Sequence, residues 1–228
     1  MIIECVNSGQ TGNPFLVLNK TVNGVSSPLC VLNDRTNVEY TEELMVFQYG
    51  DKNEKLYFSL NSPRRKDLRD KLSLTQRLGT FFILGKNDEY IGRIYREVYK
   101  PKGHKLLSYH LIKFEYGDKI YDVFEVGFGN KDGQYLCVYR ENSLVAVAQK
   151  NFPKDYGQSV YTIYSSDDTA DELGYLSAYW HFSDLHSATD FSGSDISRST
   201  MLTPFKEIME KYDDSFISRV KEKDEEMI

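Results

Sequence analysis

The sequence predicts a mainly β, antiparallel fold with helices confined to its C-terminal third. Three observations favour this class: many aromatic residues, a series of short alternating runs separated by turn residues, and a change to helical periodicity after residue 166. Of the 228 residues, 40% are hydrophobic and 14% aromatic, with 17 tyrosines and 13 phenylalanines. Such rings are enriched in strands, so the composition and the pattern agree.

The clearest strands lie between residues 79 and 166. Short polar or glycine-containing stretches divide this region into runs of five to ten residues, at 85–88, 116–119, 129–133 and 141–143. One run alternates strictly: the side chains at 106, 108, 110, 112 and 114 point one way, and those between them point the other. Regular turns between period-two runs predict an antiparallel meander.

The first part of the chain gives a weaker pattern. "PFLVLN", "PLCVLN", "LMVFQY" and "KLYFSL" are plausible strands. The charged, leucine-containing stretch at 62–79 fits either a short helix or a long loop, and the sequence does not decide between them.

A hydrophobic helix is predicted at 169–186. Thr169 and Glu172 form a capping box at its start, and the following "LGYLSAYWHFSDLH" is apolar on nearly every side. It is too short to cross a bilayer, so it should be buried within the protein. Two arrangements remain open from the pattern alone: the meander closes around the helix, or the helix lies across the open face of a sheet.

The domain organisation follows from these segments. Residues 1–188 form one domain, 189–203 form a Ser/Thr-rich linker, and 204–228 form an amphipathic helix with a charged tail that frays. Thr203 is the expected N-cap, with Pro204 at the first helical position. The apolar face of this helix, a candidate interaction surface, consists of Phe205, Ile208, Met209, Tyr212 and Phe216. It can dock on its own domain or on a partner, including a second copy.

The region from about residue 76 to 188 resembles the tubby C-terminal-like superfamily, including LURP-one-related and short bacterial tubby-like proteins, with phospholipid scramblases as distant kin. The stretches that carry the likeness are "TFFILGKNDEYIGRIYREVYK", "YHLIKFEYGDKIYDVFEVGF", "QYLCVYRENSLVAVAQKNF", "VYTIYSSDD" and the helix at 172–186. The resemblance implies a closed antiparallel β-barrel threaded by that central helix. The chain departs from the pattern at Asn142-Ser143, where a turn glycine is usual, and at Trp180-His181, where small aliphatic residues are usual.

Charge and cysteine usage bear on class and location. The net charge is −6, and residues 155–228 carry sixteen acidic and six basic side chains, which argues against a general nucleic-acid surface. The three cysteines are widely spaced without metal-ligand spacing, so free thiols in a reducing compartment are expected. The N-terminus lacks the features of a signal peptide, and no stretch is long enough to span a membrane. We expect a cytoplasmic, bacterial protein.

Two basic sets are candidates for contact with phosphate. The first, around Arg64, Arg65 and Lys66, is interleaved with acids and is better explained as a solvated face. The second is the candidate anion or lipid site: Arg93, Arg96, Lys100, Lys102 and Lys105. It lies in the region that, by the resemblance, is similar to the one carrying phosphoinositide-contacting residues in tubby-like proteins.

No catalytic or metal-binding motif is found. His181 and His186 are five residues apart, which does not place two ligands on one helical face, and "DDTADE" lacks the spacing of a calcium loop. Neither a nucleophile elbow nor a phosphate-binding loop is present. We therefore expect no cofactor and no enzyme, but a binding or scaffold module that recognises anionic, phosphoinositide-like lipid headgroups at a membrane surface. The alternative is a structural or regulatory protein acting through protein contacts of helix 204–220, and an enzyme ranks third.

Overall fold

The fold is mainly β, as the sequence predicts. The computed structural model describes residues 1–7, 15–22, 25–36, 43–49, 52–58, 80–85, 87, 89–103, 108–129, 133–151, 159–166, 172–177, 179–180 and 202–226. Between residues 6 and 58 it describes the backbone, with side chains only at Asn19 and Val25.

The strands follow one another along the chain in an antiparallel meander. Their bounds are β1 Ile2–Asn7, β2 Phe15–Val22, β3 Val25–Thr36, β4 Glu43–Tyr49, β5 Lys52–Phe58, β6 Phe81–Leu84, β7 Tyr90–Tyr99, β8 Tyr109–Tyr116, β9 Lys119–Gly127, β10 Gln134–Arg140, β11 Ser143–Lys150 and β12 Ser159–Ser165. Consecutive strands from β1 to β12 pair with each other, and β1 also pairs with β12, so the order of the ladders returns to its start. β1 is an element that the sequence analysis did not identify.

Residues with a left-handed backbone close two of the hairpins. Gly117, between β8 and β9, has φ 60°, which glycine adopts without strain. Between β10 and β11, Glu141 and Asn142 both have positive φ, 50° and 67°, as a two-residue hairpin turn requires. The predicted reversals at 116–119 and 141–143 are therefore confirmed, and asparagine replaces glycine in the second because it tolerates this conformation.

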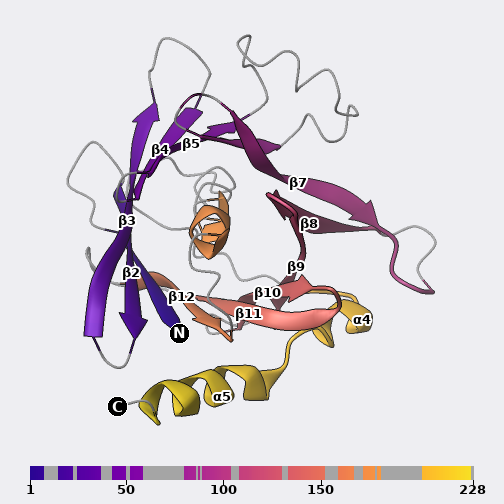
Figure 1. Ribbon diagram of the computed structural model, residues 1–228. Coiled ribbons are helices and arrows are strands. Elements are labelled where there is room, and N and C mark those ends of the chain that lie inside the picture. The colour runs from indigo at the N-terminus through magenta and orange to yellow at the C-terminus, as the bar shows by residue number, and fades with distance from the viewer. Residues whose placement is uncertain are drawn as a thin grey trace.

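A helix lies inside the ring of strands (Figure 1). Residues 172–177, 179 and 180 are helical and buried, and we call them the central helix. Leu173, Leu176 and Trp180 share one hydrophobic cluster with side chains from β1 and from β6 to β12. The residues of the central helix are the described residues of the helix predicted at 169–186. Thr169 of the capping box and the histidines at 181 and 186 lie outside the described residues.

The strands bury side chains on both faces. On β8, Ile112 and Phe114 face the central helix and belong to its cluster, whereas Leu111 on the other face belongs to a second cluster. We call these the inner and outer faces of the sheet. The outer face is apolar here because the end of the chain covers it.

The terminal segment, residues 202–226, runs along the outer face of the last strands (Figure 1). It contains two helices, α4 Lys206–Met209 and α5 Asp214–Glu225, so the prediction of a single helix from residue 204 is wrong. The predicted N-cap is wrong too: Phe205 caps α4 without a side-chain hydrogen bond, and the Thr203 side chain bonds to β9. α5 continues through Glu225, into the stretch expected to fray. Of the predicted linker, the part up to residue 201 lies outside the described residues.

Candidate functional site

The predicted basic set is divided between β7 and the connection that follows it. Arg93 and Arg96 lie on β7 and, three residues apart on a strand, they face opposite sides of the sheet. Lys100 and Lys102 lie in the β7–β8 connection with exposed side chains. Lys105 lies outside the described residues. The structure thus does not bring the two arginines and the two lysines together on one surface.

Arg93 lies on the outer face in a bidentate ion pair with Glu115. The two residues are opposite each other in the β7–β8 ladder, and the guanidinium nitrogens Nε and Nη2 lie 2.7 and 2.9 Å from the carboxylate oxygens. The Tyr95 hydroxyl donates to the same carboxylate at 2.9 Å. Gly92 permits this close pairing, because a Cβ there would meet the Glu115 carbonyl oxygen.

The pKa of Glu115 reflects this environment. Burial alone would raise it, but the hydrogen bonds from Arg93 and Tyr95 outweigh burial and lower the pKa below its ordinary value. For Tyr95, burial and the hydrogen bond to Glu115 raise the pKa to about 12. The Arg93 charge is therefore matched by an ionised carboxylate at neutral pH.

The Glu115→Gln variant tests this pairing through its pH dependence. Because the folded-state pKa of Glu115 is lowered, its contribution to stability is complete above the ordinary value of 4.5 and is lost as the pH falls through the folded value. At neutral pH we expect the variant to be less stable by about 1 kcal/mol, and the difference from wild type to shrink as the pH falls below 4.5. Urea unfolding across this pH range measures it. The control is Glu97→Gln, an exposed carboxylate 3.9 Å from Lys113, for which a smaller change is expected. A difference that persists in acid would contradict the assignment.

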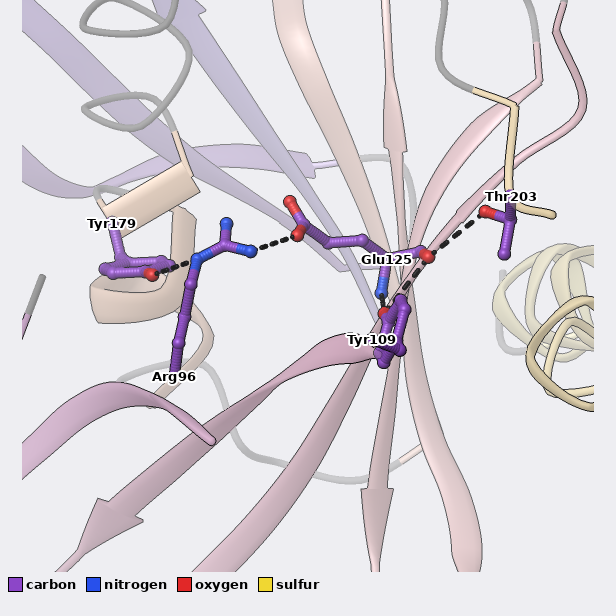
Figure 2. A network of polar contacts seen from close by, with 5 residues as sticks. All are labelled: Arg96, Tyr109, Glu125, Tyr179 and Thr203. Carbon is purple, nitrogen blue, oxygen red and sulfur yellow. Dashed lines mark hydrogen bonds and ion pairs between the residues drawn. The ribbon is translucent and has the colours of Figure 1, made fainter. Parts of the chain in front are cut away.

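Arg96 points to the inner face and connects β7 to the central helix (Figure 2). Its Nη1 lies 2.8 Å from the Glu125 carboxylate, and its Nε donates to the Tyr179 hydroxyl at 3.0 Å. Burial opposes the guanidinium charge, but the carboxylate and the hydroxyl outweigh burial and raise the Arg96 pKa above its ordinary value. Arg96 therefore keeps its charge on the inner face, beside the Glu125 side chain.

The main chain of Glu125 extends the same network to the terminal segment. Tyr109 bridges the peptide groups of Glu125, accepting from its N–H and donating to its carbonyl oxygen. The Thr203 hydroxyl accepts from the Gly127 N–H at 2.9 Å and contacts the Glu125 carbonyl oxygen at 3.5 Å. Figure 2 shows Glu125 between the central helix and Thr203. One residue of β9 thus joins three segments that are distant in sequence.

The β7–β8 connection holds an acidic side chain of α4. The Tyr99 hydroxyl donates to one carboxylate oxygen of Glu207, and the Lys102 backbone N–H donates to the other at 2.9 Å. These hydrogen bonds, that from Tyr99 first, lower the pKa of Glu207, and the charges of Lys102 and Lys211 act in the same direction. The β7–β8 connection therefore presents hydrogen-bond donors that bind an anionic group, and the Glu207 carboxylate is bound to them.

The predicted interaction residues lie against the chain's own sheet. Phe205 and Ile208 are buried in a cluster with Leu111, Phe124, Val126 and Cys137 of the outer face. Tyr212 stacks on Tyr135 with ring centroids 4.2 Å apart, and Phe216 packs on Val147 and Tyr164. Met209 is half-buried. The sequence left open whether this apolar face docks on its own domain or on a partner, and the structure shows it docked on its own sheet.

The described cysteines are buried thiols. Burial raises the pKa of Cys5 on the inner face to about 12, and it also raises that of Cys137 beneath α4. Within the described ranges, no group of three or more His, Cys, Asp or Glu side chains is placed to hold a metal ion. No described helix combines the length and apolarity needed to cross a bilayer.

Comparison of the chain with family models, with curated proteins and with solved structures finds no match.

Sequence reasoning identified the basic residues but not their acidic partners. Glu115 and Glu125 are 22 and 29 residues away from Arg93 and Arg96, and only the register of the ladders brings them close. The hairpin turn at 117–118 fixes the register of β8 on β9 but not that of β8 on β7, so it does not place Glu115 opposite Arg93. Nothing local in the sequence indicates Glu207 as a partner of Tyr99 and Lys102.

Proposed function

We propose that this protein is a non-enzymatic binding module of tubby-like type, a closed antiparallel barrel around the central helix, that recognises anionic, phosphoinositide-like lipid headgroups through its β7–β8 connection. The order of the ladders, which returns to β1, supports the architecture. The interior around the central helix is occupied by packed side chains, which favours a ligand that binds outside the sheet.

The observation that carries the function is the exposure of cationic and apolar side chains at the β7–β8 connection and the end of β7. Lys100 and Lys102 are exposed, and Val98, at the end of β7, is 48% exposed. Cationic and apolar side chains together suit the surface of an anionic bilayer, where each lysine contributes about 1 kcal/mol. Arg93 and Arg96 are already in ion pairs, so the proposed site uses the lysines, with Lys105 added from the sequence, and leaves the arginines as structural residues.

A flotation assay tests the proposal. The full chain is mixed at low salt with phosphatidylcholine vesicles, with and without phosphatidylinositol bisphosphate. We expect binding only to the anionic vesicles, weakened by added salt because surface charges are screened. The triple variant Lys100→Ala/Lys102→Ala/Lys105→Ala should lose about 3 kcal/mol of attraction, a reduction in binding of about a hundredfold.

A matched control removes three charges from the other basic set, as Arg64→Ala/Arg65→Ala/Lys66→Ala. This control variant changes the net charge of the protein by the same amount as the first triple variant. If vesicle binding falls equally in both, the attraction is a general effect of charge and does not come from this site. Failure of the wild-type protein to bind anionic vesicles at low salt would refute the proposed function.

The alternative function, protein contacts through residues 204–220, which form α4 and the start of α5, receives no separate support from the structure. Its apolar face lies against the outer face of the sheet, so a partner would first have to displace the terminal segment.

A further inference from the structure

An anion site is visible at the β7–β8 connection because the chain's own carboxylate occupies it. Both oxygens of Glu207 accept hydrogen bonds, one from the Tyr99 hydroxyl and one from the Lys102 N–H. A backbone N–H, a phenol hydroxyl and a nearby lysine are donors that suit a phosphate oxygen as well as a carboxylate oxygen. The same donors cannot serve Glu207 and a phosphate at once.

The helix that carries Glu207 does not hold its position by itself. α4 has four residues and no side-chain N-cap, and so short a helix is not stable without tertiary contacts. Its contacts include Glu207 at the connection, the buried Phe205 and Ile208, and the Tyr139 hydroxyl, which donates to the Lys211 carbonyl oxygen at 2.8 Å. Thr203, just before α4, adds hydrogen bonds to Gly127 of β9. Loss of the Glu207 contact should therefore weaken the docking of α4.

The charge of the terminal segment favours the same arrangement. Residues 202–226 carry eight acidic and five basic side chains, a net charge of −3. An anionic membrane repels such a segment, whereas the lysines of the connection attract it. Docking and membrane binding thus compete for the same basic surface.

We propose that the terminal segment is an autoinhibitory latch, in which Glu207 occupies the anion site formed by Tyr99 and Lys102 and a phosphate-bearing ligand competes with it. This inference rests on the proposed function for the identity of the ligand. By linkage, a ligand that displaces Glu207 favours the undocked state, and undocking raises the affinity of the site by the same factor. Undocking also uncovers the outer face around Phe124 and Cys137.

Cys137 provides the measurement, because its thiol lies beneath α4 and is shielded from solvent while the latch is closed. The full chain is alkylated with iodoacetamide, and the rate at Cys137 is followed by mass spectrometry of the digested protein, which separates it from the other cysteines. Glu207→Gln keeps the shape of the side chain and removes its charge. We expect the Cys137 rate and the affinity for phosphoinositide vesicles each to rise about two- to fivefold.

Two further variants separate the latch from a general loss of structure. Glu210→Gln removes a charge from the same segment, where Glu210 pairs with Lys206 at 3.6 Å on the surface. It should leave the Cys137 rate unchanged and raise vesicle affinity less than Glu207→Gln does. Tyr99→Phe removes a donor to Glu207 and also a donor to the ligand. It should raise the Cys137 rate without raising vesicle affinity.

A second set of experiments measures Cys137 alkylation in the wild-type protein after addition of one of three reagents: phosphoinositide vesicles, plain phosphatidylcholine vesicles or soluble inositol hexakisphosphate. Phosphoinositide vesicles should accelerate Cys137 alkylation, and plain phosphatidylcholine vesicles should not. Acceleration by soluble inositol hexakisphosphate as well assigns the site to phosphate itself, and acceleration by vesicles alone assigns it to a headgroup at a surface. Equal Cys137 rates in Glu207→Gln and Glu210→Gln would overturn the latch. A raised rate in Glu207→Gln with no vesicle binding by either protein would support the latch and refute the proposed function.

Discussion

Replacing Trp180 with alanine is expected to lower the free energy of unfolding by about 3–5 kcal/mol. The indole is 5% exposed and stacks on Tyr161, with ring centroids 4.7 Å apart and an interplanar angle of 27°. Removing it leaves a cavity between the central helix and the inner face of β12 at Tyr161. Urea unfolding followed by far-UV circular dichroism measures the change, because the variant lacks the single tryptophan as a fluorophore.

The control for this variant is Ile120→Ala on β9, which truncates a side chain that is 60% exposed. Its expected effect is below about 1 kcal/mol, because little buried surface is lost. If Trp180→Ala unfolded at the same urea concentration as wild type, the central helix would not form part of the core. Intrinsic fluorescence of the wild-type protein gives an independent check, since the single indole reports on burial at the central helix.

Arg96→Met is expected to lower the free energy of unfolding by about 2–4 kcal/mol. The variant removes the guanidinium that pairs with Glu125 on the inner face and leaves that carboxylate, whose side chain is 16% exposed, without its cation. An uncompensated charge in such a place costs more than the pair itself contributes. The measurement is again urea unfolding at neutral pH.

A double variant separates the pair from the packing of the arginine. In Arg96→Met/Glu125→Leu both charges are gone, so stability should recover relative to Arg96→Met alone. Arg93→Met is the control, since it breaks an ion pair on the outer face and leaves a Glu115 carboxylate that is 25% exposed and still accepts from Tyr95, so it should cost about 1 kcal/mol. Equal losses for Arg96→Met and Arg93→Met would show that Arg96 has no special role.

The strand pattern could be predicted from the sequence because it depends on local features. The turn residues between β8 and β9 and between β10 and β11 are where the sequence places them, with positive φ at Gly117, Glu141 and Asn142. The four apolar runs before residue 61 overlap with β2 to β5, although β5 begins at Lys52, within the stretch "YGDKNEK" that the sequence favours as a turn. β1 was missed because Ile2–Asn7 is short and its alternation of Ile3 and Cys5 inward with Ile2 and Glu4 outward spans few residues.

The terminal segment was predicted less well, because its apolar residues keep helical spacing across the point where α4 ends and α5 has not yet begun. Phe205, Ile208, Tyr212 and Phe216 are spaced as in one helix, yet the chain leaves α4 after Met209 and restarts at Asp214. Asp213 marks the restart: its side chain accepts from the Ser215 N–H at 3.0 Å as an N-cap. The dipeptide Asp213-Asp214 before Ser215 was therefore a readable start signal inside the apparent helix.

The candidate site was predicted only in its basic half. Exposed Lys100 and Lys102 agree with the expectation of an accessible basic surface, whereas Arg93 and Arg96 are engaged by carboxylates. An arginine's partner across a ladder or in another segment depends on strand register and on tertiary docking, which composition does not encode. Charge counts alone therefore overestimate the cationic surface of such a sheet.

The pairing of β1 with β12 bears on how the protein is made. Residues 2–6 of β1 pair with residues 159–164 of β12, so one edge of β1 stays unpaired until β12 has been synthesised more than 150 residues later. Until then the nascent chain exposes an unpaired edge and an unfilled apolar interior, since the central helix is synthesised later still. Truncated products ending before residue 159 should therefore aggregate or recruit chaperones, and refolding should be slow for a chain of this length.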